Sequence, residues 1–268
     1  MKAHCKSHWL KDYLNAALDY LYPPIHNCPG CGAEDIPIED QPTSLCPPCH
    51  ATFPWVEPRD LPRDVSAVAH YEGGARTLVS HLKYREGQYL APVMAKLMAA
   101  ALEEQGCLNP DRIHRESISA IPALPASAPT ASTIQISPWL VIPVPLHPAR
   151  QKERGYNQSQ LLASQLAHVL EFSYIPHALS RQKKTAPLHR LSRQQRAATL
   201  ADSMVLGEEH HQQIRHRHIL LVDDIYTTGA TANACREALQ QAAPASITLA
   251  AFALADLMTL RGGHSHVP

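Results

Sequence analysis

The sequence predicts an α/β domain with a mostly parallel sheet flanked by helices, preceded by a small metal-binding module. Branched apolar runs, typical of buried parallel strands, alternate with helical patterns in the second half of the chain. One of these runs ends in two acids and a small, hydroxyl-rich turn. Near the N-terminus, four of the seven cysteines form two Cys-x-x-Cys pairs. These three observations set the fold class.

Composition limits what the chain can be. With 268 residues, 45% of them hydrophobic, it has room for one α/β domain of about 200 residues and a small appendage. Basic and acidic residues balance at 24 each and the pI is near 7.3, so no overall basic bias indicates nucleic acid. No apolar run reaches the roughly 18 residues of a membrane span, and the N-terminus lacks a signal-peptide core. We expect a cytoplasmic protein.

The two cysteine pairs predict a structural zinc site, because a reducing compartment favours metal over disulfides. Four thiolates close a tetrahedral shell and leave no open position for chemistry. A redox dithiol is the alternative, but it would normally open a helix within a βαβ pattern, which is absent here. His26 or His50 could replace one thiolate. The predicted ligands are Cys28, Cys31, Cys46 and Cys49.

Apolar periodicity predicts the remaining elements. Residues 8–22 form an amphipathic helix that prolines end. Residues 109–138, rich in Pro, Ser, Ala and Thr, form a mobile surface insertion. We assign residues 1–60 to the N-terminal helix and zinc ribbon, and residues 61–268 to the α/β domain. Further strands are expected at 65–71, 139–145, 204–206 and 247–255, and further helices at 75–84, 89–104, about 158–171 and 192–200.

Residues 219–231 carry the strongest chemical prediction. A buried strand, Ile219–Val222, ends at Asp223 and Asp224, and a helix begins at Thr231. Backbone N–H groups, hydroxyls and the helix dipole suit a phosphate, and the acids suit the hydroxyls of a neighbouring polyol. A turn made only for chain reversal would explain neither acids nor flanking hydroxyls, so we predict a sugar-phosphate site. The turn residues are Thr227, Thr228, Gly229, Ala230 and Thr231, with Gly229 permitting a positive φ.

Basic residues predict a second anion site. Arg150, Lys152 and Arg154 cluster in a loop between strand 139–145 and the next helix; an ordinary exposed loop is the alternative. Lys83, at the end of helix 75–84, is either a phosphate ligand or a solvated side chain. The basic stretch 181–190 is a lid over a polyphosphate, a solvated face or a contact for a nucleic-acid backbone.

Taken together, the chain resembles the ComF/GntX family, which comprises competence protein F and amidophosphoribosyltransferase-like proteins. Residues 219–231 resemble the phosphoribosyl-pyrophosphate (PRPP) motif of type I phosphoribosyltransferases. The chain departs from related sequences in the lid, where Leu188 and Thr199 stand at positions that tend to be Gln and Asn. The other motifs that carry the resemblance are Leu21–Pro24 leading into the cysteine pairs, Leu82–Tyr84, and Pro143–His147 with Arg154–Gln158.

The resemblance implies a type I phosphoribosyltransferase fold with an N-terminal zinc ribbon. It also implies that Asp223 and Asp224 bind the ribose hydroxyls of PRPP and that Thr227–Thr231 hold its 5-phosphate. Residues Leu146–Gly155 would lie near the pyrophosphate, with Mg²⁺ bridging ribose and pyrophosphate oxygens.

Two functions stay open at this point. One is a Mg²⁺-dependent phosphoribosyltransferase that acts on an unknown nitrogen nucleophile. The other is a non-catalytic PRPP-sensing adaptor that contacts single-stranded DNA or a DNA-uptake protein. The resemblance points to DNA uptake in competence and, in some members of the family, to gluconate use.

Overall fold

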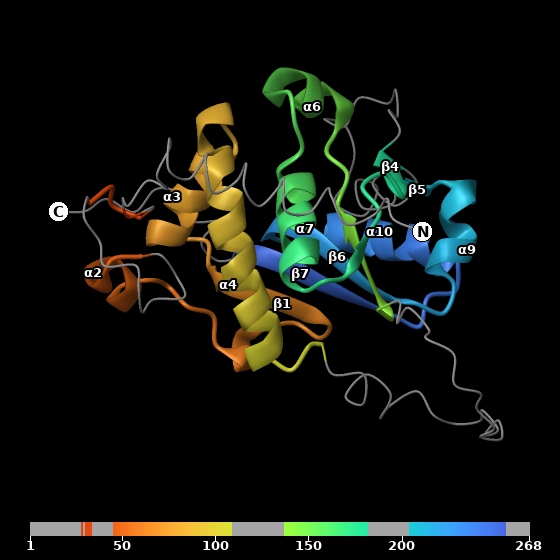
Figure 1. Cartoon of the computed structure of the whole chain (residues 1–268), viewed down its shortest axis with the longest axis horizontal. Coiled ribbons are helices and arrows are strands. Elements are labelled where there is room, and N and C mark those ends of the chain that lie inside the picture. Colours follow the sequence, from red (N-terminus) through yellow and green to blue (C-terminus); the bar gives the residue numbers. More distant parts are fainter. Residues whose placement is uncertain (1–27, 29, 34–44, 109–136, 182–203, 256–268) are drawn as a thin grey trace, which may run out of the picture. The chain divides into compact units, whose positions relative to one another are not determined.

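The computed structural model describes residues 28, 30–33, 45–108, 137–181 and 204–255 (Figure 1). The predicted N-terminal helix 8–22, the insertion up to residue 136, the lid beyond Arg181 and the helix 192–200 lie outside these residues. The chain forms two compact units, Met1–Thr52 and Phe53–Pro268.

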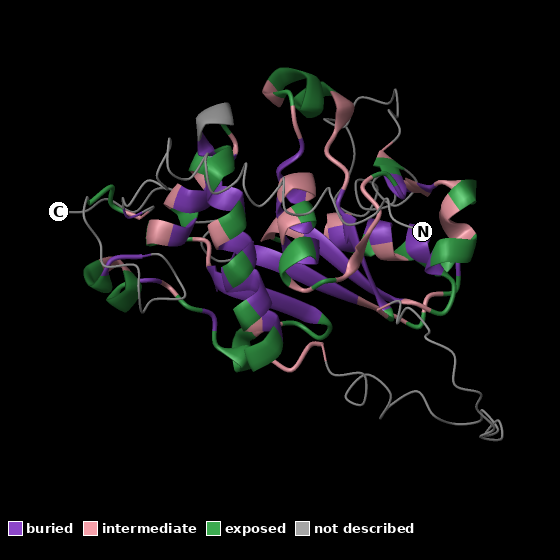
Figure 2. Cartoon of the chain, viewed as in Figure 1, coloured by how far each residue is buried: buried purple, intermediate pink, exposed green. Residues whose placement is uncertain are grey.

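The larger unit is built on a five-stranded sheet in which every neighbouring pair is parallel. Its centre is buried on both faces, as the purple strands of Figure 2 show, and Ile219–Val222 are fully buried. Branched residues with no polar alternation therefore mark a central parallel strand, and the predicted α/β class is confirmed. In spatial order the strands are β1 (Val65–His70), β7 (Ser246–Leu254), β6 (His218–Tyr226), β2 (Trp139–Pro143) and β3 (Ser173–Tyr174).

Helices cover both faces of this sheet. Figure 1 shows α4 and α7 side by side on the near face, where α4 packs on β1 and β7 and α7 packs on β2 and β6. The apolar side of α10 joins alternate residues of β2 and β6 in one buried cluster, which α4 and α7 do not share. The helices are α3 (Gly73–Leu82), α4 (Ala91–Glu104), α7 (Gln158–Val169) and α10 (Ala230–Gln240), with the 3-10 helix η2 (Arg85–Leu90) between α3 and α4.

The predicted strand at 204–206 exists but lies outside the main sheet. As β5 (Met204–Leu206) it pairs antiparallel with β4 (Leu179–Arg181) in a separate two-stranded sheet. Met204 and Leu206 pack into the same cluster as α10. The short helices η4 (Glu208–His210) and α9 (His211–Ile214) then lead to β6.

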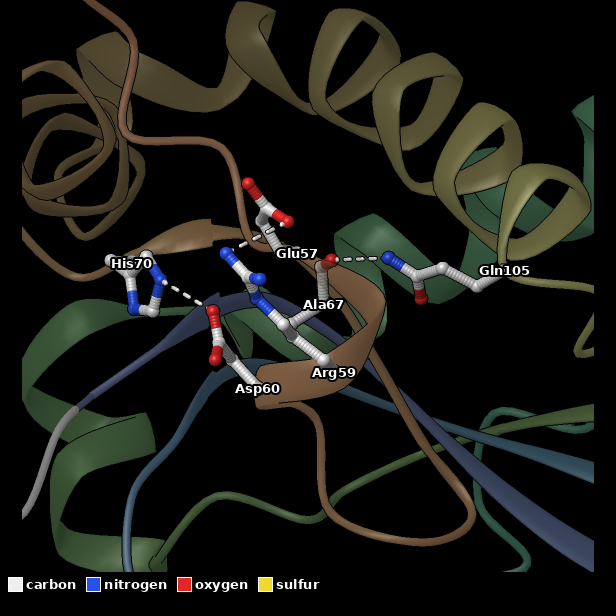
Figure 3. A network of polar contacts seen from close by, with 6 residues as sticks. All are labelled: Glu57, Arg59, Asp60, Ala67, His70 and Gln105. Atoms are coloured by element: carbon white, nitrogen blue, oxygen red, sulfur yellow. Dashed lines mark hydrogen bonds and ion pairs between the residues drawn. The ribbon is translucent and has the colours of Figure 1, made fainter.

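The outer edge of β1 is covered by side chains and by the preceding turn (Figure 3). Gln105, at the end of α4, donates from Nε2 to the carbonyl oxygen of Ala67 at 2.9 Å. On the same strand His70 lies 3.9 Å from Asp60 of the 3-10 helix η1 (Pro58–Asp60). The backbone of this edge is also paired, because Trp55 forms an antiparallel bridge with Ala69 and the N–H of His70 donates to the carbonyl oxygen of Pro54 at 2.7 Å. A strand edge whose backbone groups are already bonded does not recruit a further strand.

The connections leaving β2 and β6 run in opposite directions. From β2 the chain passes through α6 (Pro148–Arg154) and α7 to β3 at one edge. From β6 it passes through α10 to β7 on the other side. In open parallel sheets such a switch point leaves a crevice beyond the carboxyl ends of the two strands, where ligands bind. Both segments predicted to bind anions begin here.

Candidate functional site

Asp223 and Asp224 lie on the part of β6 that extends beyond β2. The predicted strand 219–222 is too short: pairing with β7 continues to Tyr226, whereas pairing with β2 stops at Val222. The acids are therefore inside the strand rather than after it. They border the open side of β6, at the switch point.

The carboxyl group of Asp223 is held by two hydrogen bonds to one oxygen. The hydroxyl of Ser159 donates to Oδ1 at 2.9 Å, and so does the backbone N–H of Asp224 at 2.9 Å. Burial, followed by the negative charge of Asp224, raises the pKa of Asp223 well above its usual value, while the Ser159 bond opposes that rise. Asp223 is thus a partly buried acid whose charge depends on its hydrogen-bond donors.

The N-cap of α10 is a glycine, which has no side chain to bond the N–H groups of the first turn. Gly229 is the N-cap and has the predicted positive φ, at 75°. Thr227 and Thr228 are exposed beside it, and Oγ1 of Thr228 accepts only one long hydrogen bond, of 3.4 Å, from Ala230. Uncapped N–H groups, exposed hydroxyls and the positive end of an eleven-residue helix suit a phosphate.

The basic segment after β2 is a helix, and the loop predicted for it is wrong. In α6, His147 is the N-cap and accepts from the Ala149 N–H at 3.2 Å, Pro148 follows at the first turn, and Gly155 ends the helix in the left-handed conformation. Proline first and glycine last favour a short helix over a loop. Arg150 and Arg154 fall on one face, one turn apart, with Arg154 half-buried. The basic residues were correctly expected between β2 and α7.

Lys83 lies at the end of α3, beside the segment that follows α6. The hydroxyl of Tyr156 donates to the carbonyl oxygen of Leu82 at 2.6 Å. Lys83 Nζ stands 5.9 Å from the ring centroid of Tyr71, just after β1. The fold therefore joins the Lys83 segment to the Arg154 segment through one side-chain bond.

Sequence reasoning assigned no role to two contributors to this region. Asn157 and Ser159, both buried at the start of α7, hold the crossover and Asp223. Arg181, the first residue of the basic stretch 181–190, lies on β4: burial lowers its pKa, the Cys235 thiol raises it, and the like charge of Arg150 lowers it further. The N-cap pattern of Asn157 is visible in the sequence, but the contact of Ser159 with β6 is not, because it spans 64 residues.

The four predicted cysteines form a single group in the N-terminal unit. Their Sγ atoms all lie within 4.8 Å of one another, and Cys31 and Cys46 are 3.6 Å apart. A tetrahedral zinc with four bonds of about 2.3 Å needs sulfurs roughly 3.8 Å apart, whereas a disulfide needs about 2 Å. The group fits zinc.

Local backbone geometry favours the thiolate of Cys28, whereas burial and the neighbouring thiols raise the pKa of Cys49. The N–H groups of Gly30 and Cys46 each donate to Cys28 Sγ at 3.3 Å. Burial raises the pKa of Cys28, but these bonds outweigh it and bring the value to about 7. A Cβ on Gly30 would lie 3.1 Å from the sulfur of Cys49, so a glycine is needed at this close approach. Gly32 has a positive φ of 74°.

Two further observations concern the rest of the described chain. A cavity of about 760 Å³ opens at the amino ends of β1 and β7 and includes none of the predicted site residues. It therefore lies at the opposite end of the sheet from the switch point. Among the helices of the described ranges, none has the length and apolar character needed to cross a membrane.

Comparison with known proteins finds relatives named for competence or for DNA utilization. No family model matches it. It is 26% identical to competence protein F of Haemophilus influenzae over 65% of this chain and 65% of that protein, so it spans just under two thirds of that relative. The DNA utilization protein YhgH of Salmonella typhimurium is 29% identical over 71% of this chain and 75% of YhgH.

A third relative matches a shorter stretch. Competence protein ComFC of Bacillus subtilis is 31% identical over 41% of this chain and 42% of ComFC. Together these matches confirm the resemblance to competence protein F and its homologues.

Proposed function

We propose that this protein binds PRPP and, with Mg²⁺, transfers its phosphoribosyl group to a nitrogen nucleophile. One observation carries the proposal: at the switch point, β6 holds an acid pair and leads directly into the hydroxyl-rich start of α10, whose N-cap has no side chain. Acids suit the two ribose hydroxyls and the helix start suits a phosphate. A 5-phosphorylated ribose has both groups on one small molecule.

Each part of PRPP has a matching part of the site. Asp223 and Asp224 accept hydrogen bonds from the ribose hydroxyls. Thr227–Thr231 receive the 5-phosphate. Arg154, on α6, and Lys83, at the end of α3, neutralise the pyrophosphate. The support for these last two is their sequence motifs and the bond from Tyr156 that joins their segments.

The reaction is a substitution at C1 of the ribose. The bond from C1 to the pyrophosphate oxygen breaks, positive charge develops on the ring, and the nitrogen of the acceptor forms the new bond and later loses a proton. Arg154 and Lys83 stabilise the departing negative charge, and the acids hold the ring in position. No side chain forms a covalent bond with the sugar.

Magnesium enters with the substrate in this proposal. Within the described ranges, the four cysteines are the one group of three or more metal-binding side chains, so no protein cage for Mg²⁺ is formed there. Mg²⁺ commonly keeps most of its waters and binds phosphate oxygens. When bound it would neutralise the pyrophosphate, while the residues of this chain orient the sugar.

A role in DNA uptake or use is proposed from the names of the relatives, competence protein F and DNA utilization protein. These names also favour a second candidate function, a PRPP-sensing adaptor that contacts single-stranded DNA or a DNA-uptake protein without turning PRPP over. Zinc bound by the cysteines would support the folding of the N-terminal unit in either case.

Pyrophosphate release separates the two candidates. Zinc-loaded protein is incubated with PRPP, Mg²⁺ and pools of nucleobases and amines, with the Asp223→Asn, Asp224→Asn double variant as control. Release that requires one acceptor, and is lost in the double variant, supports the transferase. PRPP binding without release under any pool, together with salt-dependent binding of single-stranded DNA, supports the adaptor.

A further inference from the structure

A continuous set of buried and partly buried hydrogen bonds joins the crossover after β2 to Asp223. The N–H of Val144 donates to the carbonyl oxygen of Val222 at 2.9 Å, and the Val144 carbonyl oxygen accepts from Nδ2 of Asn157 at 2.9 Å. Oδ1 of Asn157 then accepts from the N–H of Ser159 at 3.1 Å. The Ser159 hydroxyl completes the set by donating to Asp223 at 2.9 Å.

These bonds fix the position of the Ser159 hydroxyl. Asn157 and Ser159 are 7% and 5% exposed, so neither side chain exchanges its bonds freely with water. Asn157 is the N-cap of α7, and the cap places Ser159 in the first turn, with its side chain toward β6. Because the backbone of Ser159 is already fixed by its bond to Asn157, its hydroxyl loses little further conformational freedom when it bonds to an acid.

We propose that Ser159 is a positioning residue for Asp223: it fixes one carboxylate oxygen so that the other is presented to a ribose hydroxyl. This inference rests on the proposed function. Both donors, Ser159 and the Asp224 N–H, converge on Oδ1, so neither of them occupies Oδ2. Because an ionised carboxylate accepts from a hydroxyl more strongly than a neutral one does, Ser159 also favours the charged form.

Few other charged groups face Asp223. Asp224, on the same strand, disfavours its ionisation. Cys235, on α10, feels the charge of Asp223 and also that of Arg181 on β4. From α7 the contribution is the uncharged Ser159 hydroxyl. Removing that hydroxyl therefore takes away a donor that opposes the rise in the pKa of Asp223 caused by burial.

The experiment follows the titration of Asp223 in the zinc-loaded, full-length protein by carboxyl-carbon NMR, with the signal assigned from Asp223→Asn. Ser159→Ala should move the titration midpoint upward, and Ser159→Thr, which keeps the hydroxyl, should restore it. Ser164→Ala, an exposed serine on the same helix, is the matched control and should leave the midpoint unchanged. An unchanged midpoint in folded Ser159→Ala would overturn the inference.

The affinity for PRPP gives a second readout. Ser159→Ala should weaken binding by about tenfold between the wild-type midpoint and the new, higher midpoint, where only the variant is neutral, which is the value of one hydrogen bond to a charged group. The loss should be smaller at higher pH, where both proteins carry the charge. An equal loss at every pH would mean that Ser159 is merely structural and would contradict the claim. If the wild type binds no PRPP, the proposed function fails, while the NMR titration still decides whether Ser159 controls Asp223.

Discussion

The hydroxyl oxygen of Tyr226 lies 2.5 Å from the point where a Cβ on Gly229 would stand. The last residue of β6 therefore packs directly on the turn that opens α10. With φ at 75°, Gly229 meets two demands at once, left-handed backbone and the absence of a side chain. A glycine that appears in the sequence as part of a phosphate turn is thus also required by the strand before it.

Gly229→Ala should lower the free energy of unfolding by about 1–3 kcal/mol, the cost of left-handed backbone at a non-glycine residue, and should weaken PRPP binding by distorting the turn. Chemical denaturation and calorimetry measure the two effects. In a Tyr226→Phe background the clash with the hydroxyl is absent, so the same substitution should cost less. Equal costs in both backgrounds would show that the contact with Tyr226 is unimportant.

Asp223→Asn should make the ligand-free protein more stable at neutral pH while weakening PRPP binding at least tenfold, or about 1.4 kcal/mol. The pKa of Asp223 is raised on folding, first by burial and then by Asp224. Its contribution to stability is therefore fully present below the pKa of the unfolded chain and is lost as pH rises through the folded pKa.

The test compares the free energy of unfolding at several pH values. Wild type should lose stability as pH rises from the unfolded pKa of Asp223 to its folded pKa, and Asp223→Asn should lose less. Glu103→Gln, which removes an exposed carboxylate from α4, is the control and should keep the wild-type slope. If the stability of Asp223→Asn fell with pH as steeply as that of wild type, Asp223 would not be the source of the pH dependence.

Arg154→Gln should weaken the binding of PRPP by about tenfold and leave the binding of ribose 5-phosphate nearly unchanged, because Arg154 is proposed to contact only the pyrophosphate. Lys152→Gln removes an exposed charge from the same helix and should change both affinities little. Calorimetry with the two ligands measures the difference. Equal losses for both ligands would place Arg154 at the 5-phosphate or assign it a structural role.

Cys46→Ala should release the zinc. Wild-type protein purified without chelator is expected to hold about one zinc per chain, because four sulfurs gather within 4.8 Å. Cys235→Ala, which removes a buried thiol of α10 far along the chain, is the control and should keep the metal. Atomic absorption gives the content, and well under one zinc per wild-type chain would refute the zinc site.

The sequence predicted what local pattern determines. Branched runs located β2, β6 and β7, the cysteine spacing located the four-cysteine cluster, and the positive φ at Gly229 followed from the turn itself. Sequence-based prediction failed where an element's length or pairing depends on strands that are distant along the chain. The extra length of β6 depends on β7 pairing beyond the end of β2, and the separate position of β5 depends on β4.

Two local signals were also passed over. His147, Pro148 and Gly155 together mark the start and end of a short helix, yet the density of basic residues favoured a loop in the prediction. Asn157 marks the start of α7, but nothing in its surroundings predicts that the next turn reaches Asp223. Long-range contacts of this kind follow only from the order of the strands.

Calorimetric titration of the zinc-loaded wild-type protein with PRPP and Mg²⁺ decides whether the switch point binds PRPP. We expect saturable binding that is tighter than that of ribose 5-phosphate and is lost in the Asp223→Asn, Asp224→Asn double variant. Absence of PRPP binding by the wild type, or equal binding by the double variant, would contradict it.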